Sequence, residues 1–164
     1  MSYLAFVKRL IYERGDGMNQ SQISSWYQLY KNGIFRYALS ITKNTHLAED
    51  VLHDTFVKVM SVGKQCADGK EQAWLYRIAR NLCYDKLRRA KWEQAHSSIP
   101  ADEQMHFEYI DLIAALSKTD REIVTLKIVG GLAHKEIGAV LGITAAAAQK
   151  RYERAIRTLR DKEG

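Results

Sequence analysis

Apolar side chains recur at steps of three and four residues along most of this chain, and that spacing restricts the fold to packed amphipathic helices. One proline and ten glycines among 164 residues are too few for the many turns of a β-sandwich or β-barrel. The hydrophobic fraction of 46% is ample for a buried core. The sequence therefore predicts an all-α protein.

The first half of the chain is predicted to hold three helices. Apolar periodicity marks helices over about 22–42 and 46–62, and Gly63 ends the second of them. A loop with an Asp-Gly turn signal covers 64–70, and a third helix follows over about 71–91.

A change of composition separates this half from the next. Residues 93–111 contain five acids, no Lys or Arg, and the single proline, Pro100. This composition favours a flexible, solvated linker that runs into a second domain near Phe107. We therefore predict two small helical domains joined by an acidic linker, with an extension at 1–20, a first domain at 21–93, a linker at 94–105 and a second domain at 106–164.

The second domain carries the clearest local motif. Thr119 and Glu122 fit a capping box that opens a helix. A short helix over about 133–141, a tight turn at Gly142 and a last helix over about 145–161 match a helix-turn-helix. Glycine suits that turn because a positive φ angle costs it little.

The last helix has the composition of a DNA recognition helix. Thr144 is expected to cap it, the small residues Ala145–Ala148 would let it lie deep in a major groove, and Gln149 can read a base edge. Over 145–160 it carries five cations and one acid: Lys150, Arg151, Arg154, Arg157 and Arg160 against Glu153. A solvated face that suits the helix dipole is the alternative.

A second basic patch lies on the helix at 71–91. Its cations are Arg77, Arg80, Lys86, Arg88, Arg89 and Lys91, and its interleaved aromatics are Trp74, Tyr76 and Tyr84, with Trp92 following. Cations and exposed rings on one element favour single-stranded nucleic acid, because cations meet phosphate and rings stack on unpaired bases. Trp74 would equally suit a core.

Catalytic chemistry has no support in the sequence. There is no glycine-rich phosphate loop, no HExxH and no GxSxG, and the five histidines are scattered. We expect no enzyme activity, no metal, no cofactor and no small-molecule substrate. Two isolated cysteines, no signal peptide and no long apolar run favour a cytoplasmic protein with reduced thiols.

Three acids and a histidine share the polar side of the helix at 46–62: Glu49, Asp50, His53 and Asp54. Acids near a helix start satisfy the helix dipole, which is one explanation. A docking face for a basic protein surface is the other.

Two strings and the terminal motif resemble one family. AEDVLHDTFVKVM at 48–60, EQAWLYRIARNLCYDKLRRAK at 71–91 and the helix-turn-helix, in this order, resemble the extracytoplasmic-function (ECF) sigma factors. These are the smallest sigma-70-type initiation subunits of bacterial RNA polymerase. The resemblance covers 24–92, as region two, and 107–162, as region four. It implies a promoter-specificity subunit that recognises two promoter elements and assists melting.

The resemblance also implies three groups of site residues. The docking face, for the clamp helices of the polymerase β′ subunit, comprises Glu49, Asp50, His53, Asp54 and Phe56. The −10 reader, which would open the non-template strand and capture a base, comprises the 64–70 loop and the helix after it, with Lys64, Arg77, Arg80, Asn81, Tyr84, Asp85, Arg88 and Arg89. The −35 residues comprise Thr144, Ala145, Ala146, Gln149, Lys150, Arg151 and Arg154.

This chain departs from the family pattern in places. His53 stands where the family usually has Gln, and Asp54 where it has Glu. Ala147, Ala148 and Gln149 replace the frequent Thr/Ser-Val-Lys, which changes the expected −35 sequence preference rather than the binding mode.

The partners implied are core polymerase, through the β′ clamp helices and the β flap, and promoter DNA, with an anti-sigma factor as a further candidate. The free protein is expected to be a monomer whose two basic modules, held apart by the linker, reach two DNA sites at once. That interpretation requires the arginines of 77–89 to face solvent. The alternatives are a helix-turn-helix regulator that acts without polymerase and a module that binds an acidic protein.

Overall fold

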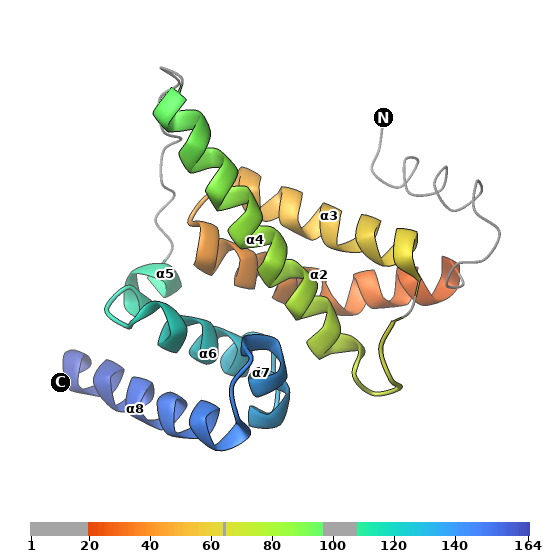
Figure 1. Ribbon diagram of the computed structural model, residues 1–164. Coiled ribbons are helices and arrows are strands. Elements are labelled where there is room, and N and C mark those ends of the chain that lie inside the picture. Colours follow the sequence, from red (N-terminus) through yellow and green to blue (C-terminus); the bar gives the residue numbers. More distant parts are fainter. Residues whose placement is uncertain (1–19, 64, 97–107) are drawn as a thin grey trace.

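The computed structural model describes residues 20–63, 65–96 and 108–164 (Figure 1). Within these ranges the chain forms seven helices and no strand, which confirms the all-α prediction. The helices are α2 (Gln20–Thr42), α3 (Thr45–Val62), α4 (Glu71–His96), α5 (Glu108–Ile113), α6 (Lys118–Ile128), α7 (His134–Leu141) and α8 (Ala145–Glu163).

Helices α2, α3 and α4 form the first module, with α2 and α3 side by side and α4 packed across them (Figure 1). The side chain of Asn44 caps α3 by accepting a hydrogen bond from the Leu47 amide at 2.9 Å. Gly63 ends α3 with a φ of 71°. The core of the module consists chiefly of Ile34, Tyr37, Val51, Phe56 and Leu75.

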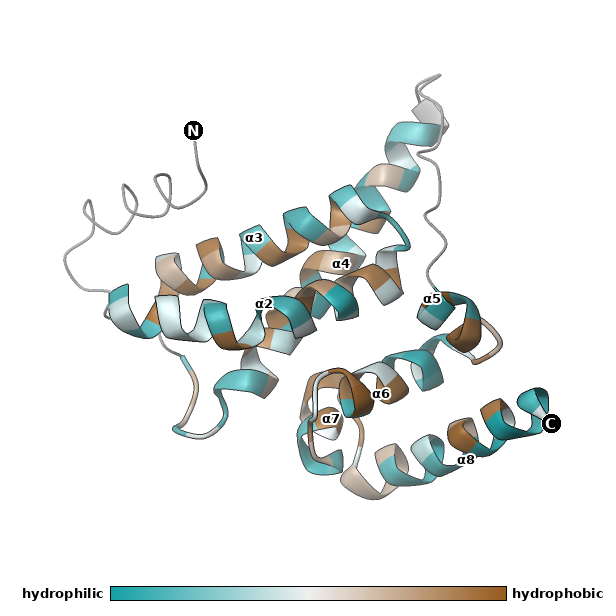
Figure 2. Ribbon diagram, turned by 180° about the vertical axis from the view of Figure 1, so that it is seen from behind, coloured by the Kyte–Doolittle hydropathy of each residue, from teal (hydrophilic) through white to brown (hydrophobic). Residues whose placement is uncertain are grey.

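Helices α5 to α8 form the second module. Gly142 adopts a left-handed conformation with φ 70°, and Thr144 accepts a hydrogen bond from the Ala147 amide at 3.1 Å, so the predicted turn and cap are both confirmed. A small cluster, Ile113, Leu116, Val124 and Ala155, ties α5 and α6 to α8. Figure 2 shows α8 as a largely hydrophilic helix at the edge of this module.

The two modules pack against each other, which the sequence did not predict. One cluster of buried side chains continues from the first module into Ile123 and Leu126 of α6, Leu132, and Ile137 of α7. We call this shared surface the seam: α2 and α4 form one side of it, and α6 and α7 form the other. The expectation that the modules are held apart is therefore wrong for this structure.

Two glycines allow the close approach at the seam. A Cβ atom at Gly33 of α2 would overlap the Tyr76 hydroxyl, and one at Gly130 would stand 3.3 Å from the same ring. Tyr76 is only 1% exposed between them. The Gln72 side chain adds a hydrogen bond to the Gly130 carbonyl across the seam.

Several predicted boundaries need correction. Helix α4 continues to His96, beyond its predicted end near 91 and into the proposed linker at 94–105, whereas α5 begins at Glu108, close to the helix start predicted near Phe107. Residues 97–107 and 1–19 lie outside the described part of the chain. In the described ranges no helix is both long and apolar enough to cross a membrane.

The predicted capping box of α6 is also wrong. Ser117, not Thr119, caps the helix, by accepting a hydrogen bond from the Asp120 amide at 3.3 Å. Glu122 does not reach back to the cap, because its side chain is buried in the seam.

Candidate nucleic-acid interface

Helix α4 presents two different faces. Trp74, Arg77, Asn81, Asp85, Arg88 and Trp92 follow one another at steps of three and four, so they share one side of the helix, which we call the α4 stripe. Arg80 and Tyr84 lie on another side, turned toward α6. The structure therefore divides the predicted −10 residues between two surfaces, whereas the sequence predicted a single basic patch.

A cavity of about 310 Å³ opens on the N-terminal half of the stripe. It lies where the end of α3, the following loop and α4 meet, and its lining is Lys58, Gln65, Trp74, Arg77, Ile78, Asn81, Leu82 and Asp85. The predicted Arg77, Asn81 and Asp85 thus come together, while Lys64 lies outside the described residues.

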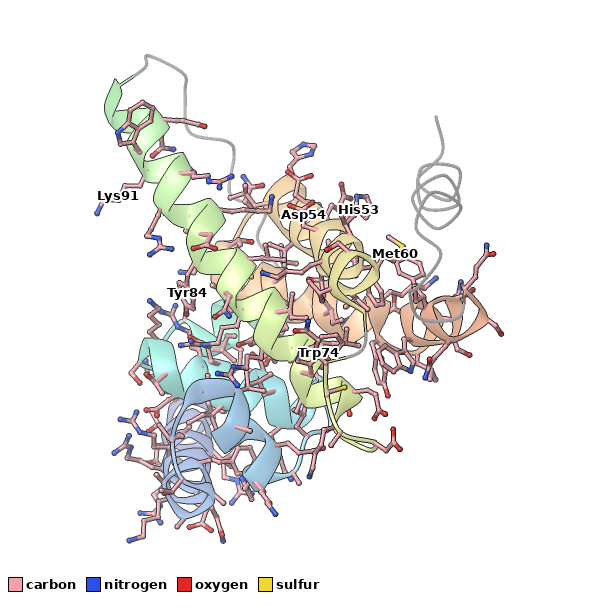
Figure 3. All side chains as sticks on the ribbon, turned by 45° about the vertical axis from the view of Figure 1, so that its right-hand side comes forward. His53, Asp54, Met60, Trp74, Tyr84 and Lys91 are labelled. Carbon is pink, nitrogen blue, oxygen red and sulfur yellow. The ribbon has the colours of Figure 1, made fainter. Side chains whose placement is uncertain are left out.

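The lining of this cavity suits an unpaired base. Trp74, Ile78 and Leu82 supply flat or apolar walls, and Asn81 and Gln65 supply hydrogen-bonding groups. Trp74 is held edge-on against Trp26 with ring centroids 6.4 Å apart, so its orientation is fixed by the core (Figure 3). The sequence did not predict Lys58 as a lining residue, whereas Gln65 belongs to the 64–70 loop that the resemblance assigns to the −10 reader and Trp74 to the aromatic pattern of the basic patch.

The other side of α4 is engaged within the protein. The Glu122 carboxylate, only 3% exposed, accepts hydrogen bonds from the Tyr37 hydroxyl at 3.0 Å, from Arg80 Nε at 2.7 Å and from the Tyr84 hydroxyl. We call these four side chains the seam cluster. Arg80 and Tyr84 were predicted to contact DNA, but here they bind the second module, so the requirement that every arginine of 77–89 face solvent is not met.

The seam cluster controls protonation nearby. Burial, and then the neighbouring Glu122 carboxylate, raise the pKa values of the Tyr37 and Tyr84 hydroxyls. The same two causes raise the pKa of the buried Cys83 thiol to about 12. Cys83 is therefore a packed thiol rather than a reactive thiolate.

A second cavity lies between the modules beside the seam cluster. Its volume is about 630 Å³. Five cations are among its lining residues, which are Ser40, Ile41, Lys43, Tyr84, Leu87, Arg88, Lys91, Lys118, Arg121 and Glu122. The Lys118 ammonium lies 4.1 Å from the centroid of the Tyr84 ring, which offsets part of this positive charge.

Helix α8 leaves the predicted −35 group at the surface, but two of its arginines also bind α6. Thr144, Ala145, Ala146, Gln149 and Lys150 are exposed. Arg154 is exposed as well and Arg151 is partly exposed, but both also pair with Asp120, at 3.2 and 3.1 Å, and Asp120 is buried near the start of α6. This pairing fixes α8 against α6, a role that the charge pattern alone did not reveal.

The acidic face of α3 is likewise divided. Glu49 and Asp50 are exposed, whereas His53 and Asp54 are half-buried (Figure 3). Asp54 pairs with Lys86 of α4 at 2.7 Å. Phe56 is 1% exposed and packs edge-on against Tyr27, so the prediction of a surface contact for Phe56 is wrong in this structure.

No cluster of potential metal ligands occurs in the described part of the chain.

Two family models match the chain. Sigma-70 region 2 matches residues 26–93, and Sigma-70, region 4 matches residues 106–159. The ECF RNA polymerase sigma factor SigM of Bacillus subtilis is 31% identical over 76% of this chain and 84% of its own length. SigE of Mycolicibacterium smegmatis is 30% identical over 87% of this chain, which spans 63% of that relative.

Solved structures resemble the whole arrangement of helices. CnrH in complex with the cytosolic domain of CnrY matches with a TM-score of 0.68 and 25% identity, over 87% of this chain and 88% of that one. The sigma factor RpoE in complex with the anti-sigma factor NepR from Bartonella quintana matches with a TM-score of 0.66, at 21% identity over 85% of this chain and 95% of that one.

The seam cluster predicts that the protein loses stability at high pH. Because the pKa of Tyr37 is raised in the folded protein, the folded state keeps a proton that the unfolded chain releases near pH 10. The free energy of unfolding should therefore be independent of this group below pH 10 and fall above it, by up to about 1.4 kcal/mol per pH unit.

Urea unfolding between pH 8 and pH 11.5 measures this effect. Tyr37→Phe should make the fall above pH 10 shallower, although it also removes one hydrogen bond at every pH. Tyr152→Phe on α8 is the matched control. Parallel curves for the Tyr37→Phe variant and the wild type would contradict the assignment.

Proposed function

The chain belongs to the extracytoplasmic-function sigma factors of the sigma-70 family, and from that premise we propose which of its surfaces recognise the promoter. A sigma factor is the promoter-specificity subunit of RNA polymerase, and the polymerase performs the chemistry. In this proposal the α4 stripe captures a base of the opened −10 element, α8 reads the −35 duplex, and the exposed acids of α3 bind the polymerase.

The cavity beside Trp74 is the observation that carries the −10 proposal. It combines a flat aromatic wall, hydrogen-bonding groups and the exposed cation Arg77 at one place. An extruded base needs these three contacts: stacking, pairing of its edge, and neutralisation of its phosphate. In the closed arrangement the proposed −10 residues at these cavities are accordingly Arg77, Asn81, Asp85, Arg88 and Arg89, with Trp74 and Gln65 added.

The −35 proposal rests on the exposed N-terminal part of α8. Gln149 and Lys150 point outward beside Ala145 and Ala146, whose small side chains let the helix approach the groove floor. Gln149 donates to Glu153 at 3.0 Å, so reading a base edge requires it to exchange that partner. Arg151 and Arg154 serve chiefly to orient α8 through Asp120.

Reading both elements at once requires the seam to open. The −35 and −10 positions are about 25 base pairs apart, which corresponds to about 85 Å of duplex at 3.4 Å per base pair. Helix α4, with 26 residues, is about 39 Å long at 1.5 Å per residue, which is less than half of that stretch of duplex. We infer that the modules separate at the promoter and that Arg80 and Tyr84 then become available to DNA.

The proposed partners are therefore core polymerase, promoter DNA and an inhibitory protein. The CnrH structure holds the cytosolic domain of CnrY. An anti-sigma factor that binds this chain in its closed arrangement would keep Arg80 and Tyr84 occupied by Glu122, since both are bound to it across the seam.

Run-off transcription tests the proposed function. Core polymerase from the source organism, supplied with this chain, should transcribe a subset of a genomic fragment library, and sequencing of the bound DNA should give one two-part motif. Core alone should not do so. A specific gel shift by the chain alone, with no transcription upon adding core, would support a regulator that acts without polymerase.

Charge reversal on α3 tests the docking face. Asp50→Lys should weaken binding to core by at least tenfold, because a lysine would face a basic surface. Asp50 is preferred to Asp54, whose pairing with Lys86 also supports the fold. Asp161→Lys, an exposed acid at the end of α8, is the control, and equal core affinity for both variants would refute the assignment.

The salt dependence of −35 binding tests the α8 assignment. Lys150→Ala should lower the slope of log affinity against log salt by about 0.9, since one phosphate contact is lost. Arg151→Ala should lower it less, because Asp120 already balances that charge at 3.1 Å. Arg36→Ala on α2 is the control. An unchanged slope for Lys150→Ala would show that the phosphate contact is made by another residue.

A further inference from the structure

The cavity between the two modules carries an excess of positive charge. Five of its lining residues are cations, namely Lys43, Arg88, Lys91, Lys118 and Arg121. Arg88 pairs with Asp85, but the other four form no ion pair with an acid in the described part of the chain. Glu122, the one acid among these described lining residues, is already bound by Arg80 at 2.7 Å. The protein itself therefore supplies no counter-charge for most of these cations.

Lys43 lines this cavity from an unusual backbone conformation. It directly follows α2 with a φ of 53°, in the left-handed region that glycine and asparagine adopt most readily. Its amide donates to the Leu39 carbonyl at 2.8 Å, which ends the helix. A glycine would end the helix equally well, so the presence of a lysine is explained by its side chain, which brings a charge to the cavity.

The cations line one compact volume. They come from the end of α2, from α4 and from α6, and Tyr84 and Lys91 lie on one side of α4 (Figure 3). The volume of about 630 Å³ falls within the range of small-ligand sites, about 300–1,000 Å³. A sphere of that volume is about 11 Å across, which is close to the Debye length at physiological salt, so the cations are only partly screened from one another.

We propose that this cavity binds a small anion with two or more linked phosphate groups, either an inorganic polyphosphate or the phosphate chain of a nucleotide. Linked phosphates carry several negative charges over a short length, and lysine and arginine are the side chains that bind them. Ile41 and Leu87 add apolar surface that a nucleoside can contact. A linear nucleic acid is instead bound by a charged groove that follows its backbone.

This anion binds only the closed arrangement. Lys43 and Lys91 belong to the first module, whereas Lys118 and Arg121 belong to the second, so a ligand that contacts all four loses half of these contacts when the seam opens. The ligand therefore stabilises the closed arrangement by its differential affinity for it. Where the modules separate at the promoter, the same ligand opposes promoter binding, and this consequence, unlike the binding itself, rests on the proposed function.

Titration calorimetry with the full-length chain tests the site. The probe is sodium tripolyphosphate in magnesium-free buffer, and sodium sulfate at equal ionic strength is the reference anion. The wild type should bind tripolyphosphate about tenfold or more tightly than sulfate. Lys43→Gly, which suits the left-handed backbone, and Arg121→Ala should each weaken binding by about 10- to 100-fold, because each removes a charged hydrogen-bond donor.

Two exposed cations outside the cavity are matched controls. Arg36→Ala on α2 and Lys135→Ala on α7 each remove one positive charge and should leave the affinity for tripolyphosphate unchanged. Thermal midpoints equal to that of the wild type exclude misfolding as the cause of a lost affinity. Lys91→Ala, at an exposed position of α4, replaces Lys43→Gly as the variant of the first module if the latter changes the midpoint.

A comparison of ATP with tripolyphosphate identifies the source of the phosphates, because both carry the same triphosphate chain. Tighter binding of ATP assigns a nucleotide, whereas equal or weaker binding assigns an inorganic polyphosphate. Equal affinity for sulfate and tripolyphosphate, or a loss of affinity in the variants of one module only, overturns the proposal. Tighter binding of a hexaglutamate peptide also overturns it, and the cavity is then a contact for an acidic polypeptide.

The titration and the run-off assay fail independently. No DNA and no polymerase take part in the titration, so a negative result there leaves the proposed function intact. If tripolyphosphate binds as expected but no promoter-dependent transcript is found, the proposed function fails and the anion site remains.

Discussion

The closed arrangement of the two modules depends on the hydrogen bonds that the buried carboxylate of Glu122 accepts. An unpaired charge in a protein interior costs several kcal/mol, so Glu122 can be buried only while Tyr37, Arg80 and Tyr84 donate to it. All three donors belong to the first module, whereas Glu122 belongs to the second. The four side chains therefore fix the relative orientation of the modules, and the apolar contacts of the seam add to the stability of that arrangement.

The seam cluster also determines which parts of α4 can meet DNA without rearrangement. The helix uses Arg80 and Tyr84 inside the protein and leaves Arg77, Asn81 and Asp85 at an open cavity. Two functions thus share one rigid element, separated only by the helical repeat. The sequence predicts one continuous basic patch, because the helical repeat of α4 does not indicate which side of the helix a neighbouring module will cover.

The sequence predicted what local spacing determines. The helices, the cap at Thr144, the turn at Gly142 and the family all followed from periodicity and motif. It failed where a long-range contact decides the outcome: Glu122 was predicted to complete a capping box but is buried in the seam, and the pairing of Arg151 and Arg154 with Asp120 was not predicted. The resemblance assigned Phe56 to the docking face, but its side chain is buried in the core and packs edge-on against Tyr27 of α2.

The small volume at Gly33 has a consequence for how readily the two halves part. A side chain there would push Tyr76 outward and loosen the fit that holds Gly130 close. If the modules separate at the promoter as proposed, the free energy of separation lowers the affinity for the promoter, because only the separated population engages both elements. Residues that never touch a nucleotide would then set the protein concentration at which transcription begins: a looser fit would lower that concentration, and a tighter one would raise it.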